Sequence, residues 1–322
     1  MHALVHRGDA WVRTEAADPV PGPADVVVSV AAAGLNRADL LMRSGNYVPT
    51  GADWAVPLDR VGFEMAGRVV AVGADVTGVR EGDRVLAQTG GACAELVAVD
   101  HRLVLGVPDG MDWTAAAALP SALLTEFDAL APAAELRGGE RVVITGASSG
   151  VGLVGVQLAR ALGAASVVAT TRSTAKLPLL RELGADTATL SLVDAVEPGT
   201  VDVALDHLGG TALADLVSLA APGARIVQIG RLAGGRSTID LEALAAHRVR
   251  LIGTTFRGRS APELHALVAR VRALLPELVE RHGVHAVVDS VFDIADAEQA
   301  AARLDAPGVT GKVVLIVMAS LA

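Results

Sequence analysis

A glycine-rich turn between a short apolar strand and a helical repeat most constrains how this chain can fold. Residues 142–144 are β-branched and predict a buried strand, and residues 145–152 have the sequence Thr-Gly-Ala-Ser-Ser-Gly-Val-Gly. Apolar residues then recur at helical spacing as far as Leu162. Such a unit suits a dinucleotide pyrophosphate, because small residues permit close approach and the helix N-terminus is partly positive; a tight connection without a ligand is the alternative. The turn residues predicted to bind the cofactor are Gly146, Ala147, Ser148, Ser149, Gly150 and Val151.

The place of this unit in the chain predicts two domains. It begins only at residue 142 of 322, so a different structure is expected before it. Short strands separated by glycine and proline turns occupy the first third, which predicts a small, partly closed β structure. Strands and helices alternate over residues 141–256, which is typical of a doubly wound parallel sheet. The predicted fold class is therefore α/β, with a mixed C-terminal tail that resembles the first third.

The junction between these regions carries helix signals. Asp112 is predicted to cap a helix that runs through an alanine-rich stretch to Leu119. Pro120 should end or kink this helix, and residues 121–130 should form the next one.

Composition excludes several classes of partner and site. The net charge is −9 without a dense block of Lys and Arg, which argues against nucleic acid as the main partner. Cys93 is the only cysteine, so an internal disulfide and a multi-cysteine zinc site are impossible. The N-terminal residues lack the apolar core of a signal peptide, and the apolar residues 313–322 are shorter than the ~20 that span a bilayer. A cytoplasmic protein without a membrane partner is expected.

The strand ends of the second region indicate which dinucleotide binds. The strand predicted at residues 166–170 is followed by Arg172, Ser173 and Lys176, and no carboxylate stands there to bind a free ribose 2′-hydroxyl. Two cations and a hydroxyl suit the 2′-phosphate of NADPH, with a solvated helix start as the alternative. Asp206 ends another predicted strand, where it either contacts the cofactor or caps the next turn, and Gly230 completes the predicted cofactor site.

The residues of this chain do not match two other classes of dehydrogenase that bind a dinucleotide. Short-chain dehydrogenases need a tyrosine downstream of the turn with a lysine four residues later, but the sole tyrosine, Tyr47, lies upstream and position 51 is glycine. Zinc alcohol dehydrogenases need a cysteine and a histidine where this chain has Asn36 and Phe63, neither of which is a credible zinc ligand. No metal is therefore expected.

Three polar residues remain as candidates for contact with the substrate and the nicotinamide. Asn36 carries an amide with two donor hydrogens and an acceptor. Tyr47 is predicted in a loop, where its phenol could donate a proton to a substrate oxygen, and Thr125 could contact the nicotinamide. Core packing for Tyr47 and a backbone hydrogen bond for Thr125 are the alternatives. Glu64 is expected to be a structural carboxylate rather than a catalytic base. The histidines without ligand spacing are expected to be surface or structural residues: His6, His101, His207 and His247.

Several segments in register resemble the zinc-free quinone oxidoreductases (zeta-crystallin-like) of the medium-chain dehydrogenase/reductase superfamily. The similarity covers nearly the whole chain, and its most specific pieces are Gly-Leu-Asn-Arg-Ala-Asp-Leu at 34–40, Gly-Phe-Glu-Met-Ala-Gly at 62–67, Gly-Asp-Arg-Val at 82–85, the Leu-Pro at 119–120, the glycine turn, Leu-Gly-Ala-Asp at 183–186 and Gly-Lys-Val-Val-Leu at 311–315. The resemblance implies a GroES-like, partly closed β-barrel catalytic domain at 1–117 and 263–322. It also implies a Rossmann domain at 118–262, NADPH, a homodimer or a tetramer built from dimers, and a quinone or enone substrate.

The same resemblance assigns residues and leaves questions open. Asn36, Tyr47 and Thr125 match positions near nicotinamide and substrate, and Gly150, Val151 and Lys176 match dinucleotide-contacting positions. The chain departs from the family at position 191, where a serine replaces a frequent tyrosine. It also departs in the short segment 192–200, which leaves little room for a helix. An enoyl thioester reductase of lipid or polyketide metabolism, and a catalytically idle NADPH-binding protein, are the competing hypotheses.

Overall fold

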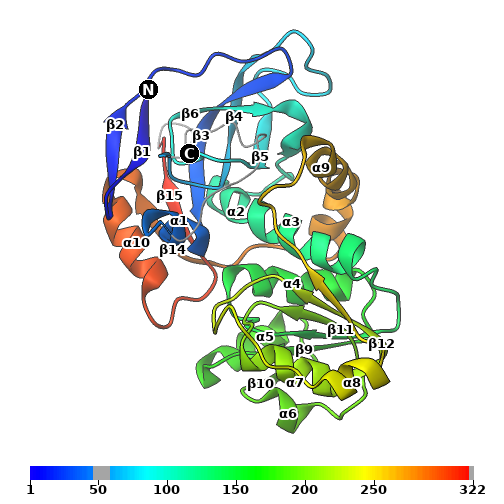
Figure 1. Cartoon of the computed structure of the whole chain (residues 1–322). Helices are drawn as coiled ribbons and strands as arrows, with labels where there is room; N and C mark the ends of the chain where they lie inside the picture. The colour runs from blue at the N-terminus through cyan, green and yellow to red at the C-terminus, as the bar shows by residue number, and fades with distance from the viewer. Residues whose placement is uncertain (46–58, 319–322) are drawn as a thin grey trace. The chain divides into compact units, whose positions relative to one another are not determined.

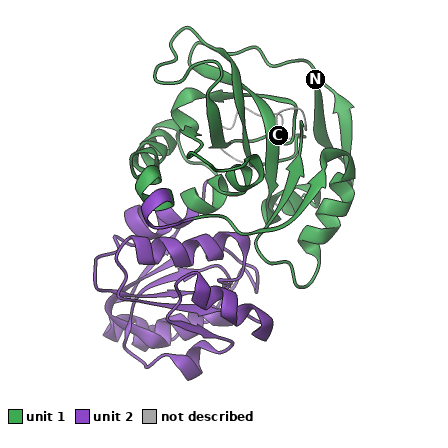
Figure 2. Ribbon diagram, turned by 180° about the vertical axis from the view of Figure 1, so that it is seen from behind, with its two compact units in different colours: residues 1–124, 257–279, 285–322 green, residues 125–256, 280–284 purple. Residues whose placement is uncertain are grey.

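The computed structural model describes residues 1–45 and 59–318, so Tyr47 lies outside the described residues. The chain forms two compact units (Figure 2). Unit 1 comprises Met1–Leu124, Arg257–Val279 and His285–Ala322, and unit 2 comprises Thr125–Phe256 and Glu280–Val284. Among the described residues, no helix is both long and apolar enough to cross a membrane.

Unit 1 is built on a largely antiparallel sheet. Within the described residues the sheet has seven strands, in the order β14-β15-β3-β4-β5-β7 with β6 paired to β3, and β1 and β2 form a separate hairpin. The bounds are β1 (His2–Arg7), β2 (Ala10–Glu15), β3 (Asp25–Leu35), β4 (Glu64–Val72), β5 (Arg84–Gln88), β6 (Leu96–Asp100), β7 (Val104–Gly106), β14 (Val288–Asp293) and β15 (Lys312–Ile316). The central strand β3 is buried nearly throughout, which explains its apolar run without alternation. The C-terminal strand β15 pairs with β3, so the tail completes the fold of the first third.

Most helical segments of unit 1 are short. Their bounds are α1 (Arg37–Arg43), η1 (His101–Leu103), α2 (Trp113–Ala118), α9 (Ala261–Pro276), η5 (Ile294–Asp296) and α10 (Ala297–Asp305). The predicted cap of α2 is confirmed, since the Asp112 carboxylate accepts a hydrogen bond from the Ala115 N–H at 2.8 Å. Helix α3 (Pro120–Asp128) starts at the proline itself, because a proline in the first turn loses no helical hydrogen bond.

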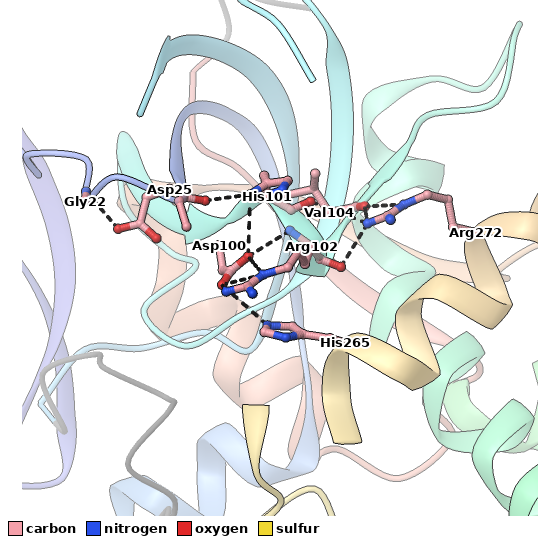
Figure 3. Close-up of polar contacts among 9 residues, drawn as sticks. Gly22, Asp25, Asp100, His101, Arg102, Val104, His265 and Arg272 are labelled. Carbon is pink, nitrogen blue, oxygen red and sulfur yellow. Dashed lines mark hydrogen bonds and ion pairs between the residues drawn. The ribbon is translucent and has the colours of Figure 1, made fainter. Parts of the chain in front are cut away.

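Helix α9 is fastened to the corner between β6 and β7 (Figure 3). The Arg272 guanidinium donates hydrogen bonds of 2.8 Å to the carbonyls of Arg102 and Val104. His265 on the same helix lies 3.4 Å from the Asp100 carboxylate, which also accepts hydrogen bonds from Arg102. Burial raises the pKa of Asp100, but the hydrogen bonds and charge of Arg102 outweigh burial and lower it. These contacts therefore hold α9 against the segment between β6 and β7.

Unit 2 contains a parallel sheet with the strand order β10-β9-β8-β11-β12-β13 among the described residues (Figure 1). Its strands are β8 (Arg141–Ile144), β9 (Ser166–Thr170), β10 (Thr187–Thr189), β11 (Val201–Asp206), β12 (Ala220–Gln228) and β13 (Arg250–Gly253). Its helical elements are the end of α3, η2 (Ala129–Ala133), α4 (Gly150–Ala161), η3 (Thr174–Lys176), α5 (Leu177–Glu182), α6 (Leu192–Ala195), α7 (Thr211–Leu219) and α8 (Leu241–Ala246), and η4 (Glu277–Arg281) lies where the chain passes between units. The predicted doubly wound sheet is confirmed. Its strand order reverses between β8 and β11, where such folds bind ligands.

The short segment after β10 forms only one helical turn. Helix α6 has four residues, and Val193 within it and Leu190 just before it are about half exposed. The sequence leaves no length for a longer helix there, as the spacing predicted.

Candidate functional site

The glycine turn connects β8 to α4 and has the shape that the sequence predicts. Gly146 has a φ of 59°, in the left-handed region that favours glycine. Ser149 caps α4, because its hydroxyl accepts a hydrogen bond from the Gly152 N–H at 3.1 Å. A Cβ added at Gly152 would lie 2.7 Å from the Ala147 Cα, so only glycine lets the turn close on the helix.

Two backbone donors of this turn are left for a ligand. The N–H groups of Gly150 and Val151 belong to the first turn of α4 and have no acceptor within the helix. In the described part of the chain, no other protein acceptor is found for them either. Donors of this kind at a twelve-residue helix N-terminus fit a phosphate anion. The turn therefore fits the pyrophosphate of a dinucleotide.

Hydrogen bonds join this turn to the end of the neighbouring strand. The Ala147 N–H donates to the Thr170 carbonyl at 2.9 Å, and the hydroxyls of Ser148 and Thr171 lie 2.8 Å apart. The Ser173 N–H donates to Thr171 Oγ1 at 3.3 Å, and Arg172 is exposed. The structure thus brings the turn and the segment that contains Arg172, Ser173 and Lys176 together at one edge of the sheet.

Asp206 and Gly230 lie at the ends of the adjacent strands β11 and β12. The Asp206 carboxylate is fully buried and accepts hydrogen bonds from Thr145 Oγ1 at 2.8 Å and from the N–H groups of Leu208 and Gly209 at 3.0 and 3.1 Å. These are the hydrogen bonds of the turn-capping alternative, in which Asp206 joins two loops. A Cβ at Gly230 would lie 2.4 Å from the His207 carbonyl oxygen, which explains the glycine.

A buried ionisable pair that the sequence pattern did not indicate lies beneath the turn. Glu126 on α3 is fully buried, and its Oε1 lies 2.6 Å from His207 Nε2. The other ring nitrogen of His207, Nδ1, lies 2.8 Å from the carbonyl oxygen of Thr145, the residue before Gly146. His207 is structural, as expected from its lack of ligand spacing. Thr125, the predicted nicotinamide contact, is half-buried and adjacent to Glu126 on the same helix.

Strand register in unit 1 explains the position of Asn36. Gly34 near the end of β3 pairs with Glu64 of β4 on one side and with Val314 of β15 on the other. Asn36 thus lies between the first residues of both neighbours. Its Oδ1 accepts a hydrogen bond from Lys312 Nζ at 2.6 Å, and its Nδ2 donates to Glu64 Oε1 at 2.9 Å.

Glu64 and Lys312 form a buried ion pair around this amide. Glu64 is fully buried, Lys312 is 3% exposed, and the second Glu64 oxygen accepts the Ser121 N–H at the start of α3 at 2.8 Å. Glu64 is therefore structural, as predicted. These two hydrogen bonds fix the orientation of the Asn36 amide, and among the described residues no partner is found for its second Nδ2 hydrogen. A single lysine at the edge of an apolar strand was the only sequence signal for Lys312.

A second buried carboxylate supports the same loop. Asp39 accepts hydrogen bonds from the N–H of Asn36 at 2.7 Å and from that of Gly62 at 2.9 Å. Burial raises the pKa of Asp39 to about 7, although both hydrogen bonds and the charge of Lys312 act to lower it. Asp39 thus ties the start of α1 to the segment before β4.

Comparison with known proteins places both units. Residues 22–117 match the family model described as the alcohol dehydrogenase GroES-like domain, and residues 150–272 match the model described as zinc-binding dehydrogenase. A quinone oxidoreductase from Pseudomonas aeruginosa is 31% identical over 306 residues, which cover 92% of each chain. The crystal structure of a quinone oxidoreductase from Thermus thermophilus, also described in complex with NADPH, matches with a TM-score of 0.81 and 31% identity over 98% of this chain and 100% of that one.

Polyketide synthases are also similar to this chain. The spectinabilin polyketide synthase system protein NorB of Streptomyces orinoci is 40% identical over 67% of this chain, and the pikromycin component PikAII of Streptomyces venezuelae is 33% identical over 98%. The chain spans a tenth or less of the length of these two synthases. The two family models, together with the glycine turn, define the class of protein. The chain belongs to the medium-chain dehydrogenase/reductase superfamily and is a quinone oxidoreductase-like member of it.

Proposed function

We propose that the protein is an NADPH-dependent, zinc-independent oxidoreductase that reduces a quinone or a related activated carbonyl compound. The observation that carries this proposal is the pair of donors at Gly150 and Val151, next to a strand end with Arg172, Ser173 and Lys176 and no carboxylate. The relatives described as quinone oxidoreductases support the acceptor class.

The residues of the chain would bind and orient the reactants. The N–H groups of Gly150 and Val151 would hold the pyrophosphate, and Arg172, Ser173 and Lys176 would hold the 2′-phosphate. Reduced nicotinamide supplies a hydride equivalent when bound. Asn36 would orient the acceptor through its second amide hydrogen, Tyr47 would donate a proton to a reduced oxygen, and Thr125 would contact the nicotinamide. Asp206 and Gly230 would shape the cofactor site.

The contacts of Asn36 support a reaction without zinc. Its amide oxygen already accepts a hydrogen bond from the Lys312 ammonium group, which also pairs with Glu64. A divalent cation bound to this amide would lie beside that positive charge. Phe63 at the other position adds no donor atom.

Cofactor preference tests the assignment of the phosphate site. We expect the wild-type protein to bind NADPH at least tenfold more tightly than NADH, and Arg172→Ala to weaken NADPH binding several-fold with little effect on NADH. Arg137→Ala is the matched control, because Arg137 is exposed and precedes β8 at the opposite end of the strand from the turn. Equal affinity for both dinucleotides would contradict the preference for NADPH.

The acceptor separates the competing functions. Similarity to polyketide synthases favours reduction of an enoyl thioester as the second candidate. NADPH oxidation would be followed with benzoquinones, naphthoquinones, alkenals and enoyl thioesters, in the wild type and in Tyr47→Phe. We expect turnover with quinones and a modest loss in the variant. Turnover with enoyl thioesters alone, with a large loss in Tyr47→Phe, would favour the second candidate, and cofactor binding without any turnover would favour an idle protein.

We further propose a homodimer. Within the described residues β13 is an edge strand of the parallel sheet, paired with β12 on one side, and its Leu251 is 43% exposed. An edge with an exposed apolar residue can pair with a second copy of itself. Sedimentation velocity should give the mass of two chains, and Leu251→Lys should shift it toward one.

A further inference from the structure

The Glu126–His207 pair is buried directly behind the dinucleotide-binding turn. His207 is 4% exposed and Glu126 is fully buried, so water does not screen their interaction. The backbone N–H of His207 donates to Thr145 Oγ1 at 3.0 Å, while its ring reaches the Thr145 carbonyl. A Cβ added at Gly146 would lie 3.5 Å from the His207 Cβ. The histidine therefore holds Thr145 through two hydrogen bonds and lies next to Gly146.

The geometry fixes the number of protons on this pair. The Thr145 carbonyl can only accept, so His207 Nδ1 carries a hydrogen. The 2.6 Å contact between Nε2 and Glu126 Oε1 also requires a hydrogen between the two atoms. The pair therefore holds two protons, whether as imidazolium with carboxylate or as neutral imidazole with carboxylic acid. Both arrangements have zero net charge.

Loss of one proton to solvent would break this arrangement. If Nε2 lost its hydrogen, its lone pair would face the Glu126 carboxylate; if Nδ1 lost its hydrogen, its lone pair would face the Thr145 carbonyl. In both cases a net negative charge would stay buried. The second oxygen of Glu126 could not compensate, because it has no hydrogen-bond partner among the described residues and lies against Gly155 of α4. The charged groups that face the ring are Glu126 from α3 and Asp206 from β11, and both favour retention of the proton.

We propose that Glu126 and His207 are a positioning pair whose shared proton holds Thr145 and Gly146 in the shape that binds the dinucleotide, so that affinity for the dinucleotide falls when this proton is lost. The inference rests on the proposed function, in which this turn binds NADPH. Burial would lower the pKa of His207, but the charge and hydrogen bond of Glu126 and the Thr145 carbonyl raise it overall. The pair therefore keeps this proton to a higher pH than a free histidine does.

The test is the pH dependence of the NADPH dissociation constant of the full chain from pH 7 to 9.5. This range lies above the pKa near 6 of a phosphate monoester, so the 2′-phosphate of NADPH does not titrate within it. The wild-type Kd should increase at least fivefold over this range. In Glu126→Gln an amide N–H can donate to a neutral His207, so no extra proton is needed, and the Kd should stay constant with pH. His247→Gln, at the end of α8, is the matched histidine control and should keep the wild-type profile.

Two further measurements distinguish the possible outcomes. The ¹⁵N resonances of the His207 ring, observed without cofactor, should titrate at a higher pH than those of a free histidine in the wild type and show no such step in Glu126→Gln. Glu126→Leu/His207→Leu, which removes both ionisable groups of the pair, should fold and bind NADPH several-fold more weakly with no pH dependence. Identical pH profiles of Kd in the wild type and Glu126→Gln would overturn the inference alone. Failure of the wild type to bind NADPH at any pH would overturn the proposed function.

Discussion

Lys312 contributes to the stability of the fold through its ion pair with the buried Glu64 carboxylate. Its ammonium group neutralises Glu64 and orients Asn36 at the same time. Lys312→Met would leave the Glu64 carboxylate buried without a counter-charge, which costs about 3–5 kcal/mol. Urea unfolding should show this loss.

The double variant Glu64→Gln/Lys312→Met is the control, because it removes both charges. It should recover a large part of the lost stability, since burying a neutral amide costs less than burying an unpaired carboxylate. If the double variant were as unstable as Lys312→Met, the ion pair would not be the origin of the effect.

The close packing of α4 against α3 requires a glycine at position 155. A Cβ at Gly155 would lie 2.3 Å from Glu126 Oε2, on a carboxylate already fixed by His207. Alanine normally stabilises a helix interior by ~1 kcal/mol relative to glycine, but overpacking costs about 1–3 kcal/mol. We therefore expect Gly155→Ala to destabilise the protein in thermal or urea unfolding.

A glycine with open space around it provides the comparison. Nothing lies within 4 Å of a Cβ added at Gly235, and its φ is not positive, so Gly235→Ala should leave stability nearly unchanged. Adding Glu126→Ala to Gly155→Ala should relieve the clash. A stabilising Gly155→Ala would show that the carboxylate can move aside.

At the scale of the whole molecule, Asp39 gives stability a pH dependence. Its pKa rises on folding from 3.8 to about 7, so the folded state holds a proton that the unfolded state loses first. The contribution is complete below pH 3.8 and is lost as the pH rises toward 7, at up to about 1.4 kcal/mol per pH unit. Other carboxylates act in the opposite sense, so the prediction concerns a difference between two proteins.

Asp39→Asn isolates this contribution because its side chain does not titrate. The variant loses one of the two acceptors for the N–H groups of Asn36 and Gly62, so it should be less stable than the wild type at pH 4. The gap in unfolding free energy should narrow between pH 4 and 7. A gap that widens with pH would mean that Asp39 is charged in the folded protein.

Local sequence determined the elements of this protein, and tertiary structure decided how its polar groups are used. The glycine turn, the Asp112 cap and the doubly wound alternation follow from periodicity and backbone sterics within a few residues, so they were predictable. The Glu126–His207 pair joins residues 81 positions apart, and Asn36 meets Lys312 across 276 positions through the register of β3 and β15. No local pattern encodes such contacts, because a side chain finds its partner only when distant strands and helices have packed. For that reason Asp206 could be predicted as a strand end with two alternative roles, but the hydrogen bonds by which it joins two loops emerged from the fold.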